Sequence, residues 1–93
     1  GGVSGAIADN AAGFAAMTLM DKEKEPLTIE FKINFLNIAE GEKLVAEAEI
    51  LQAGRSIFHG ESKVYTIKKK EKILTATALV TIKATSKVSE KLR

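Results

Sequence analysis

The N-terminal stretch Gly1–Met20, GGVSGAIADNAAGFAAMTLM, decides the fold. It holds one charged side chain, Asp9, whereas all fourteen basic and eleven of the twelve acidic residues lie beyond it. Its six alanines favour a helix, which we expect over about Val3–Met20. A surface helix normally shows a charged face. This helix has none, so we expect it to be covered on most sides. A carboxylate in such apolar surroundings is unfavourable unless it is paired with another group or serves a function. Asp9 is therefore the first candidate functional residue.

Two glycines, Gly5 and Gly13, lie inside the expected helix. Glycine destabilises a helix relative to alanine. Each of the two therefore indicates close contact with a neighbouring segment or with a ligand.

Four stretches of alternating apolar and polar residues follow a charged linker, residues 21–26, and predict half-buried strands. They are Leu27–Leu36, Lys43–Gln52, Ser56–Ile67 and Ile73–Lys83. In the first strand the residues expected to face the core are Leu27, Ile29, Phe31, Ile33 and Phe35. Short connections favour an antiparallel meander. The second and fourth strands carry small alanines on the side expected to face inward, which suits a sheet that curls round the helix. The predicted fold class is α+β.

Composition excludes several classes of protein. The length of 93 residues suits one domain. Without cysteine there are no disulfides and no thiolate metal site, which favours a cytoplasmic location. The single histidine, His59, excludes a histidine-rich metal site and is interpreted as a surface or interface residue. A net charge of +2 from nearly balanced lysine and glutamate argues against nucleic-acid binding. Neither a signal peptide nor a transmembrane span is expected.

A small sheet wrapped round one helix has exposed edges, which are commonly paired with another chain. We therefore expect a homodimer formed through a sheet edge. Apolar residues on the outer face of the sheet allow two interpretations. They are either covered in a homotetramer or scattered singly over the surface.

Four motifs together resemble the hotdog-fold acyl-CoA thioesterases, in particular the phenylacetate-degradation type of the hydroxybenzoyl-CoA thioesterase superfamily. They are Gly-Gly-Val at residues 1–3, Ala-Asp-Asn at residues 8–10, TIEFKINFL at residues 28–36 and LQAGRSIF at residues 51–58. The resemblance covers nearly the whole chain and implies a long central helix wrapped by an antiparallel sheet. The family has a further strand and a histidine before the position of Gly1. Residues 1–93 are therefore expected to form one hotdog domain that lacks the N-terminal strand.

The resemblance also implies roles for individual residues. Asp9 would be the catalytic carboxylate, acting as general base on water or as nucleophile, and the amide of Gly2 would stabilise the oxyanion. The implied substrate-binding residues are Gly1, Asn10, Thr28, Gly54, Arg55 and Ser56. Thr28 would help position the attacking water, and the turn at residues 54–56 would hold phosphate or pantetheine. The alternatives are an Asp9 that bonds to a neighbouring subunit, a flexible N-terminus and an exposed arginine in a plain hairpin.

These observations predict an acyl-CoA thioesterase that releases a carboxylic acid and free CoA. It would need no metal or dissociable cofactor, since coenzyme A belongs to the substrate. Dehydration chemistry is disfavoured because no histidine accompanies Asp9. Two alternatives stay open: a non-catalytic acyl-CoA-binding or sensor module, and a purely structural oligomerisation domain. Phe14 and Met17 fit the border of an acyl tunnel and the core equally well.

Overall fold

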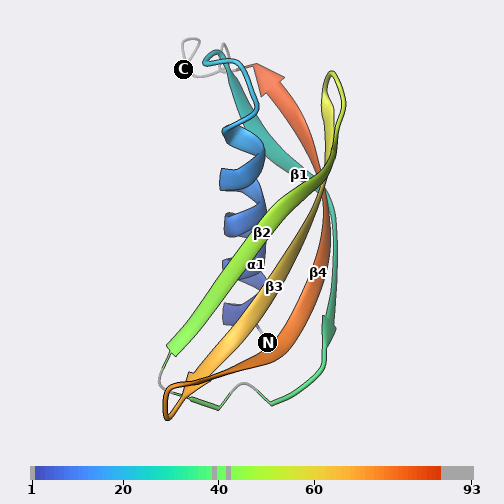
Figure 1. The fold of residues 1–93 in the computed structure, drawn as a ribbon. Coiled ribbons are helices and arrows are strands. Elements are labelled where there is room, and N and C mark those ends of the chain that lie inside the picture. Colours follow the sequence, from blue (N-terminus) through green and yellow to red (C-terminus); the bar gives the residue numbers. More distant parts are fainter. Residues whose placement is uncertain (1, 39, 42, 87–93) are drawn as a thin grey trace.

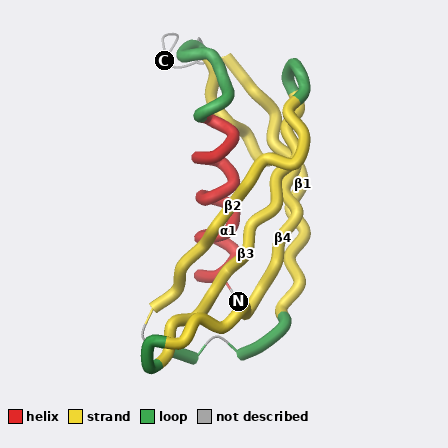
Figure 2. Tube along the Cα trace, viewed as in Figure 1, coloured by secondary structure: helices red, strands yellow, loops and turns green. Residues whose placement is uncertain are grey.

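The computed structural model describes residues 2–38, 40–41 and 43–86. Helix α1 (Gly2–Met17) precedes four strands: β1 (Lys24–Phe35), β2 (Lys43–Ala53), β3 (Ile57–Lys68) and β4 (Glu71–Ser86). The strands form one antiparallel sheet, and α1 lies along its concave face (Figures 1 and 2). The predicted α+β fold with a wrapped helix is confirmed. The helix ends at Met17, three residues before the predicted end.

The strand order is β1-β4-β3-β2, so the predicted meander is wrong for the first connection. Strands β2, β3 and β4 follow one another as hairpins, whereas β1 and β2 lie at opposite edges. The chain crosses the end of the sheet between them, where the N–H groups of Leu36 and Asn37 donate to the carbonyl oxygen of Thr75 at 2.8 and 3.3 Å. Seven linking residues can reach about 23 Å. That exceeds the roughly 14 Å between strands three places apart, so a short connection does not require neighbouring strands.

Gly41 lets this crossover pass close to the end of β3. A Cβ atom there would lie 2.7 Å from the carbonyl oxygen of Ile67 and would overlap the side chain of Thr66. Only glycine therefore fits without moving the backbone.

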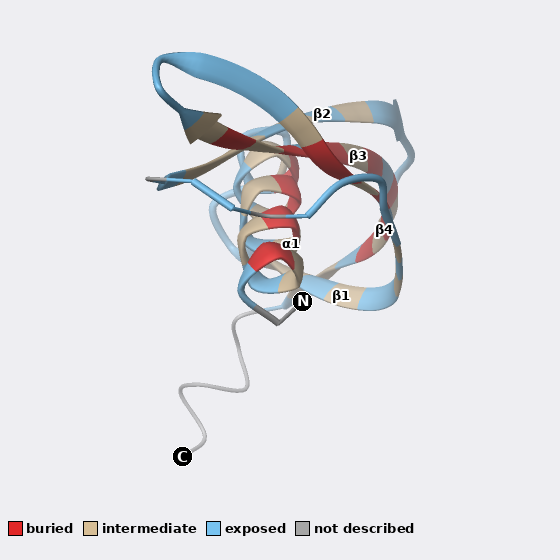
Figure 3. Cartoon of the chain, turned by 90° about the horizontal axis from the view of Figure 1, so that it is seen from below, coloured by how far each residue is buried: buried red, intermediate tan, exposed pale blue. Residues whose placement is uncertain are grey.

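The core lies between α1 and the inner face of the sheet (Figure 3). Small residues at every fourth helical position make the contact. Ser62 in β3 donates a hydrogen bond to the carbonyl oxygen of Ala8 at 2.7 Å, and a Cβ at Gly60 would lie 3.7 Å from that of Ala12. The buried apolar residues are Ala8, Ala12, Ala16, Phe58, Val64, Ala76, Ala78, Val80 and Ile82.

A β-bulge at Ile29 changes which side chains of β1 face the helix. The register shifts between Thr28 and Glu30, so Thr28 lies opposite the buried Ile82 and Phe31 opposite the buried Val80. Side chains directly opposite each other share a face of the sheet. The inward prediction is thus confirmed for Phe31 but wrong for Leu27 and Ile29, which are each 52% exposed.

Within one copy of the chain, the sheet covers only one side of α1. Val3 and Phe14 are about two-thirds exposed, and Met17 is also exposed. The expectation of a helix covered on most sides is therefore not met by this chain's own strands. Apart from Asn10, the exposed side chains described in α1 are apolar, and the half-buried Asp9 is its only charged residue.

Replacing Gly41 by alanine tests the crossover contact. Because the added Cβ must displace backbone or Thr66, we expect a loss of about 1–3 kcal/mol in the free energy of unfolding. Gly5→Ala is the control, since its Cβ would meet Phe31 at an ordinary 3.8 Å. Urea denaturation should show destabilisation for Gly41→Ala alone. Equal stability of the two variants would contradict the close approach.

Candidate active site

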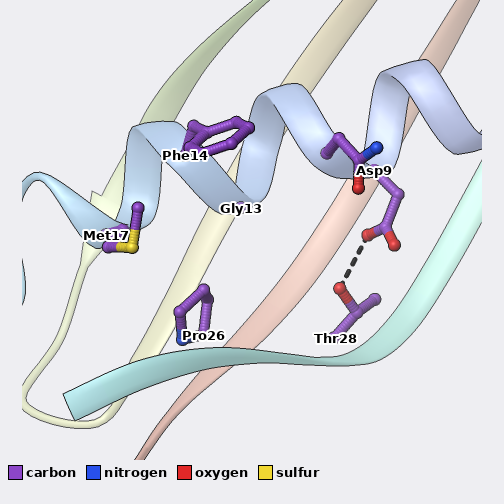
Figure 4. A pocket seen from close by; sticks show the side chains of 7 residues that line it. Asp9, Gly13, Phe14, Met17, Pro26 and Thr28 are labelled. Atoms are coloured by element: carbon purple, nitrogen blue, oxygen red, sulfur yellow. Dashed lines mark hydrogen bonds between the residues drawn. The ribbon is translucent and has the colours of Figure 1, made fainter.

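Asp9 of α1 and Thr28 of β1 face each other across the gap between helix and sheet (Figure 4). The Thr28 hydroxyl donates a hydrogen bond to Oδ1 of Asp9 at 2.6 Å. That length lies within the usual range for a hydroxyl donor. No other described residue bonds to this carboxylate, so Oδ2 keeps its lone pairs for a water molecule or a substrate.

Two local features produce this pairing. The bulge at Ile29 places Thr28 on the helix-facing side of β1, where an unbroken alternation would have turned it outward. The bond from Ser62 to the Ala8 carbonyl oxygen fixes the helix one residue before Asp9. The sheet therefore positions both side chains. Pairing of β1 with β4 positions Thr28, and the contact of β3 with α1 positions Asp9.

Beside the Asp9–Thr28 pair lies a pocket of about 230 Å³. Its lining residues are Asp9, Asn10, Gly13, Phe14, Met17, Pro26 and Thr28. Asp9 and Thr28 make one end polar, whereas Phe14, Met17 and Pro26 make the other end apolar (Figure 4). Asp9 is the only charged group in the lining. The arrangement suits a ligand whose polar reacting group continues into an apolar tail.

The structure brings together three of the predicted site residues, Asp9, Asn10 and Thr28. Gly2 begins α1, seven residues before Asp9, and Gly1 lies outside the described residues. The predicted turn residues lie elsewhere. Gly54 and Arg55 line a separate depression beside the C-terminal end of α1, next to Leu19 and Met20, and the adjoining Ser56 is exposed. One copy of the chain therefore does not place this turn beside Asp9.

Sequence reasoning missed Pro26 as a lining residue. It precedes Thr28 by two positions and so shares its face of β1, a relation hidden by the expected outward direction of Thr28. The two helix glycines were predicted to mark a contact with a neighbouring segment or with a ligand. Gly5 packs beside the ring of Phe31, and Gly13 lines the pocket.

Other classes of site find no support in the described part of the chain. No three histidine, cysteine, aspartate or glutamate side chains there group as metal ligands would. His59 is exposed and lies opposite Thr81 on the sheet, away from Asp9. No helix among the described residues has the length and apolarity that crossing a bilayer requires.

A long helix cradled by an antiparallel sheet is the architecture of the hotdog fold. The family model of the thioesterase superfamily matches residues 1–73. The chain belongs to this superfamily. No curated protein sequence matches it significantly.

Solved structures agree with this assignment. A thioesterase family protein from Silicibacter pomeroyi is 38% identical, with a TM-score of 0.89 over 91% of this chain and 62% of its own. A Bacillus halodurans protein crystallised with CoA is 24% identical, with a TM-score of 0.85 over 91% and 58%. A Haemophilus influenzae thioesterase is 21% identical, with a TM-score of 0.81 over 91% and 57%. The chain thus spans about three-fifths of each of these structures.

Asp9→Ala tests whether the carboxylate has a structural role. The variant loses a hydrogen bond worth about 0.5–1.5 kcal/mol and gains roughly half a kcal/mol of helix propensity. We therefore expect the free energy of unfolding to change by less than about 1 kcal/mol, as measured by urea denaturation. A loss well above about 2 kcal/mol would show that Asp9 holds the fold together.

Proposed function

We propose that the protein hydrolyses acyl-CoA thioesters to a carboxylic acid and free CoA. The observation that carries this proposal is the Asp9 carboxylate, held by Thr28 at the polar end of an otherwise apolar pocket. Membership of the thioesterase superfamily supports it. The CoA that accompanies the Bacillus halodurans protein of the same fold is consistent with it.

In the proposed reaction Asp9 acts as general base. Thr28 holds Oδ1 and leaves Oδ2 to take a proton from a water molecule, whose oxygen attacks the thioester carbonyl carbon. The tetrahedral intermediate collapses by breaking the C–S bond, and the proton passes to the departing CoA thiolate. Direct attack by Oδ2 is the alternative route. It would form an acyl anhydride with Asp9, which water would then hydrolyse. Both routes use only this chain's side chains and water.

The oxyanion of the intermediate needs a preorganised donor, which we assign to the amide of Gly2 at the start of α1. Seven residues of helix separate Gly2 from Asp9 by about 10 Å along the axis. A donor and a base that serve one carbonyl each stand roughly 3 Å from the atoms they contact. We therefore propose that each active site takes Gly2 from one copy and Asp9 from a second copy in a homodimer.

The remaining predicted binding residues fit the same proposal. Asn10 lies beside Asp9 in the pocket lining and can bond to the thioester or the adjoining amide. Arg55, with Gly54 and Ser56, would hold the CoA phosphates, because a guanidinium suits phosphate oxygens. Gly1 would adjoin the Gly2 donor. A cytoplasmic location stays a prediction from composition.

Asp9→Asn tests the chemistry directly. The amide cannot accept the proton from water, so we expect release of free thiol from acyl-CoA to fall by about a hundredfold to ten-thousandfold. Acyl-CoA binding, measured by calorimetry, should stay within about threefold because the side chain keeps its shape. The assay needs acetyl, octanoyl, palmitoyl and phenylacetyl substrates with a thiol reagent.

Two results would contradict the proposed function. Tight binding of acyl-CoA with no turnover by the wild type would identify a binding or sensor module. Neither binding nor turnover would identify a structural domain. Full activity of Asp9→Asn would reject Asp9 as the base or nucleophile while leaving hydrolysis in place.

A mixed-subunit experiment tests the shared site. Gly2→Pro removes the proposed donor N–H, yet proline is accommodated in the first turn of a helix. We expect Gly2→Pro and Asp9→Asn to be nearly inactive separately. Co-expressed and purified as mixed dimers with two different tags, they should regain activity, because one of the two sites then carries both native groups. Mixed dimers that stay inactive would show that Gly2 and Asp9 act within one copy.

A further inference from the structure

Gly13 leaves open space in the wall of the pocket. A Cβ built on Gly13 meets no atom within 4 Å, whereas the one built on Gly5, in the same helix, would touch Phe31. Glycine in a helix is less stable than alanine. Nothing in this chain's described residues occupies the space that the missing side chain leaves.

The open space lies along the line of the proposed reaction. Gly13 is four residues after Asp9, so it lies one turn further along the same side of α1. Beyond it, Phe14 from the helix and Pro26 from β1 border the pocket, and Met17 lies at the end away from Asp9 (Figure 4). The eight residues from Asp9 to Met17 span about 12 Å of helix.

The chemistry of the walls indicates which part of an acyl-CoA would lie there. The pantetheine arm contains two amides, and these need hydrogen-bond partners when they leave water. Past Asn10 and Thr28, the lining consists of Gly13, Phe14, Met17 and Pro26, whose side chains offer no such partner. An apolar acyl chain needs none. The pocket is also about two turns long, which exceeds the length of a single aromatic ring.

We propose that Gly13 is a specificity-determining residue, whose missing side chain keeps the pocket open from Asp9 to Met17 and so admits a medium-length aliphatic acyl chain. This inference rests on the proposed function, because it places the thioester carbonyl at Asp9. A span of about 12 Å accommodates roughly eight to ten carbons in an extended chain. A side chain at Gly13 would close the pocket about 6 Å from Asp9, after roughly four carbons.

The test compares Gly13→Ala, Gly13→Leu and the wild type in the assembled protein. Gly5→Ala is the matched control, since it makes the same substitution in the same helix outside the pocket lining. For each protein, kcat/KM is measured with acetyl-, butyryl-, octanoyl- and decanoyl-CoA. Binding of the corresponding S-alkyl-CoA thioethers, which cannot be hydrolysed, is measured by calorimetry. Size-exclusion chromatography with light scattering records the oligomeric state.

For the wild type we expect thioether affinity to rise about fourfold per added methylene up to eight to ten carbons. In Gly13→Leu the ratio of octanoyl to butyryl kcat/KM should fall at least thirtyfold, with a smaller fall in Gly13→Ala. Gly5→Ala should keep the wild-type ratio. Both alanine variants should raise the melting temperature, because alanine stabilises a helix and neither Cβ meets an obstacle.

Three results would overturn the inference. An equal loss for every chain length in Gly13→Leu would show that the pantetheine arm occupies the pocket. Unchanged ratios in all variants would show that the acyl chain lies elsewhere. Dissociation of the assembly by Gly13→Ala would show that the space admits a second copy of the chain. If no thioester is hydrolysed but thioether binding follows the expected pattern, the proposed function fails and the acyl pocket stands.

Discussion

The close approach of α1 to β3 is the contact on which the rest of the structure depends. It requires small groups on both sides, and the chain supplies Gly60 opposite Ala12 and Ser62 against the Ala8 backbone. The buried hydroxyl of Ser62 gains a partner that does not compete with the sheet's own hydrogen bonds. Together these contacts fix the position of α1 along the sheet and its rotation about its own axis. The side of α1 that carries Asp9 and Gly13 consequently has one orientation toward β1.

The same contact explains why a carboxylate is tolerated in so apolar a helix. Asp9 adjoins the buried stripe, yet it is only half-buried and lies where the helix leaves the cover of the sheet. There it has a hydroxyl partner on one oxygen and access to the pocket on the other. Desolvation is therefore partial, and the group stays available for chemistry.

Sequence reasoning predicted the elements of this fold better than their arrangement. The helix and the four strands followed from local periodicity in the sequence. The bulge at Ile29 left no such signal, since Leu27 and Ile29 are apolar although they are exposed. Strand order depends on pairing between distant residues, which a connection of seven residues does not determine. The apolar–polar alternation of the first strand predicted that Thr28 points outward. Only the family resemblance placed Thr28 near the substrate.

The crossover between β1 and β2 separates the part of the chain that lines the pocket from the part that supplies most of the buried core. Every residue that lines the pocket belongs to residues 9–28, a continuous helix–turn–strand segment. Six of the nine buried apolar residues, together with the contacts that hold this segment, come from residues 57–86. The lining of this pocket and most of the buried core are thus encoded in separate blocks of a small domain. Residues 9–28 form a segment that could be exchanged between relatives of this fold. The exchange must keep Ala12, Ala16 and the bulge at Ile29, because these features fit the segment to the rest of the sheet.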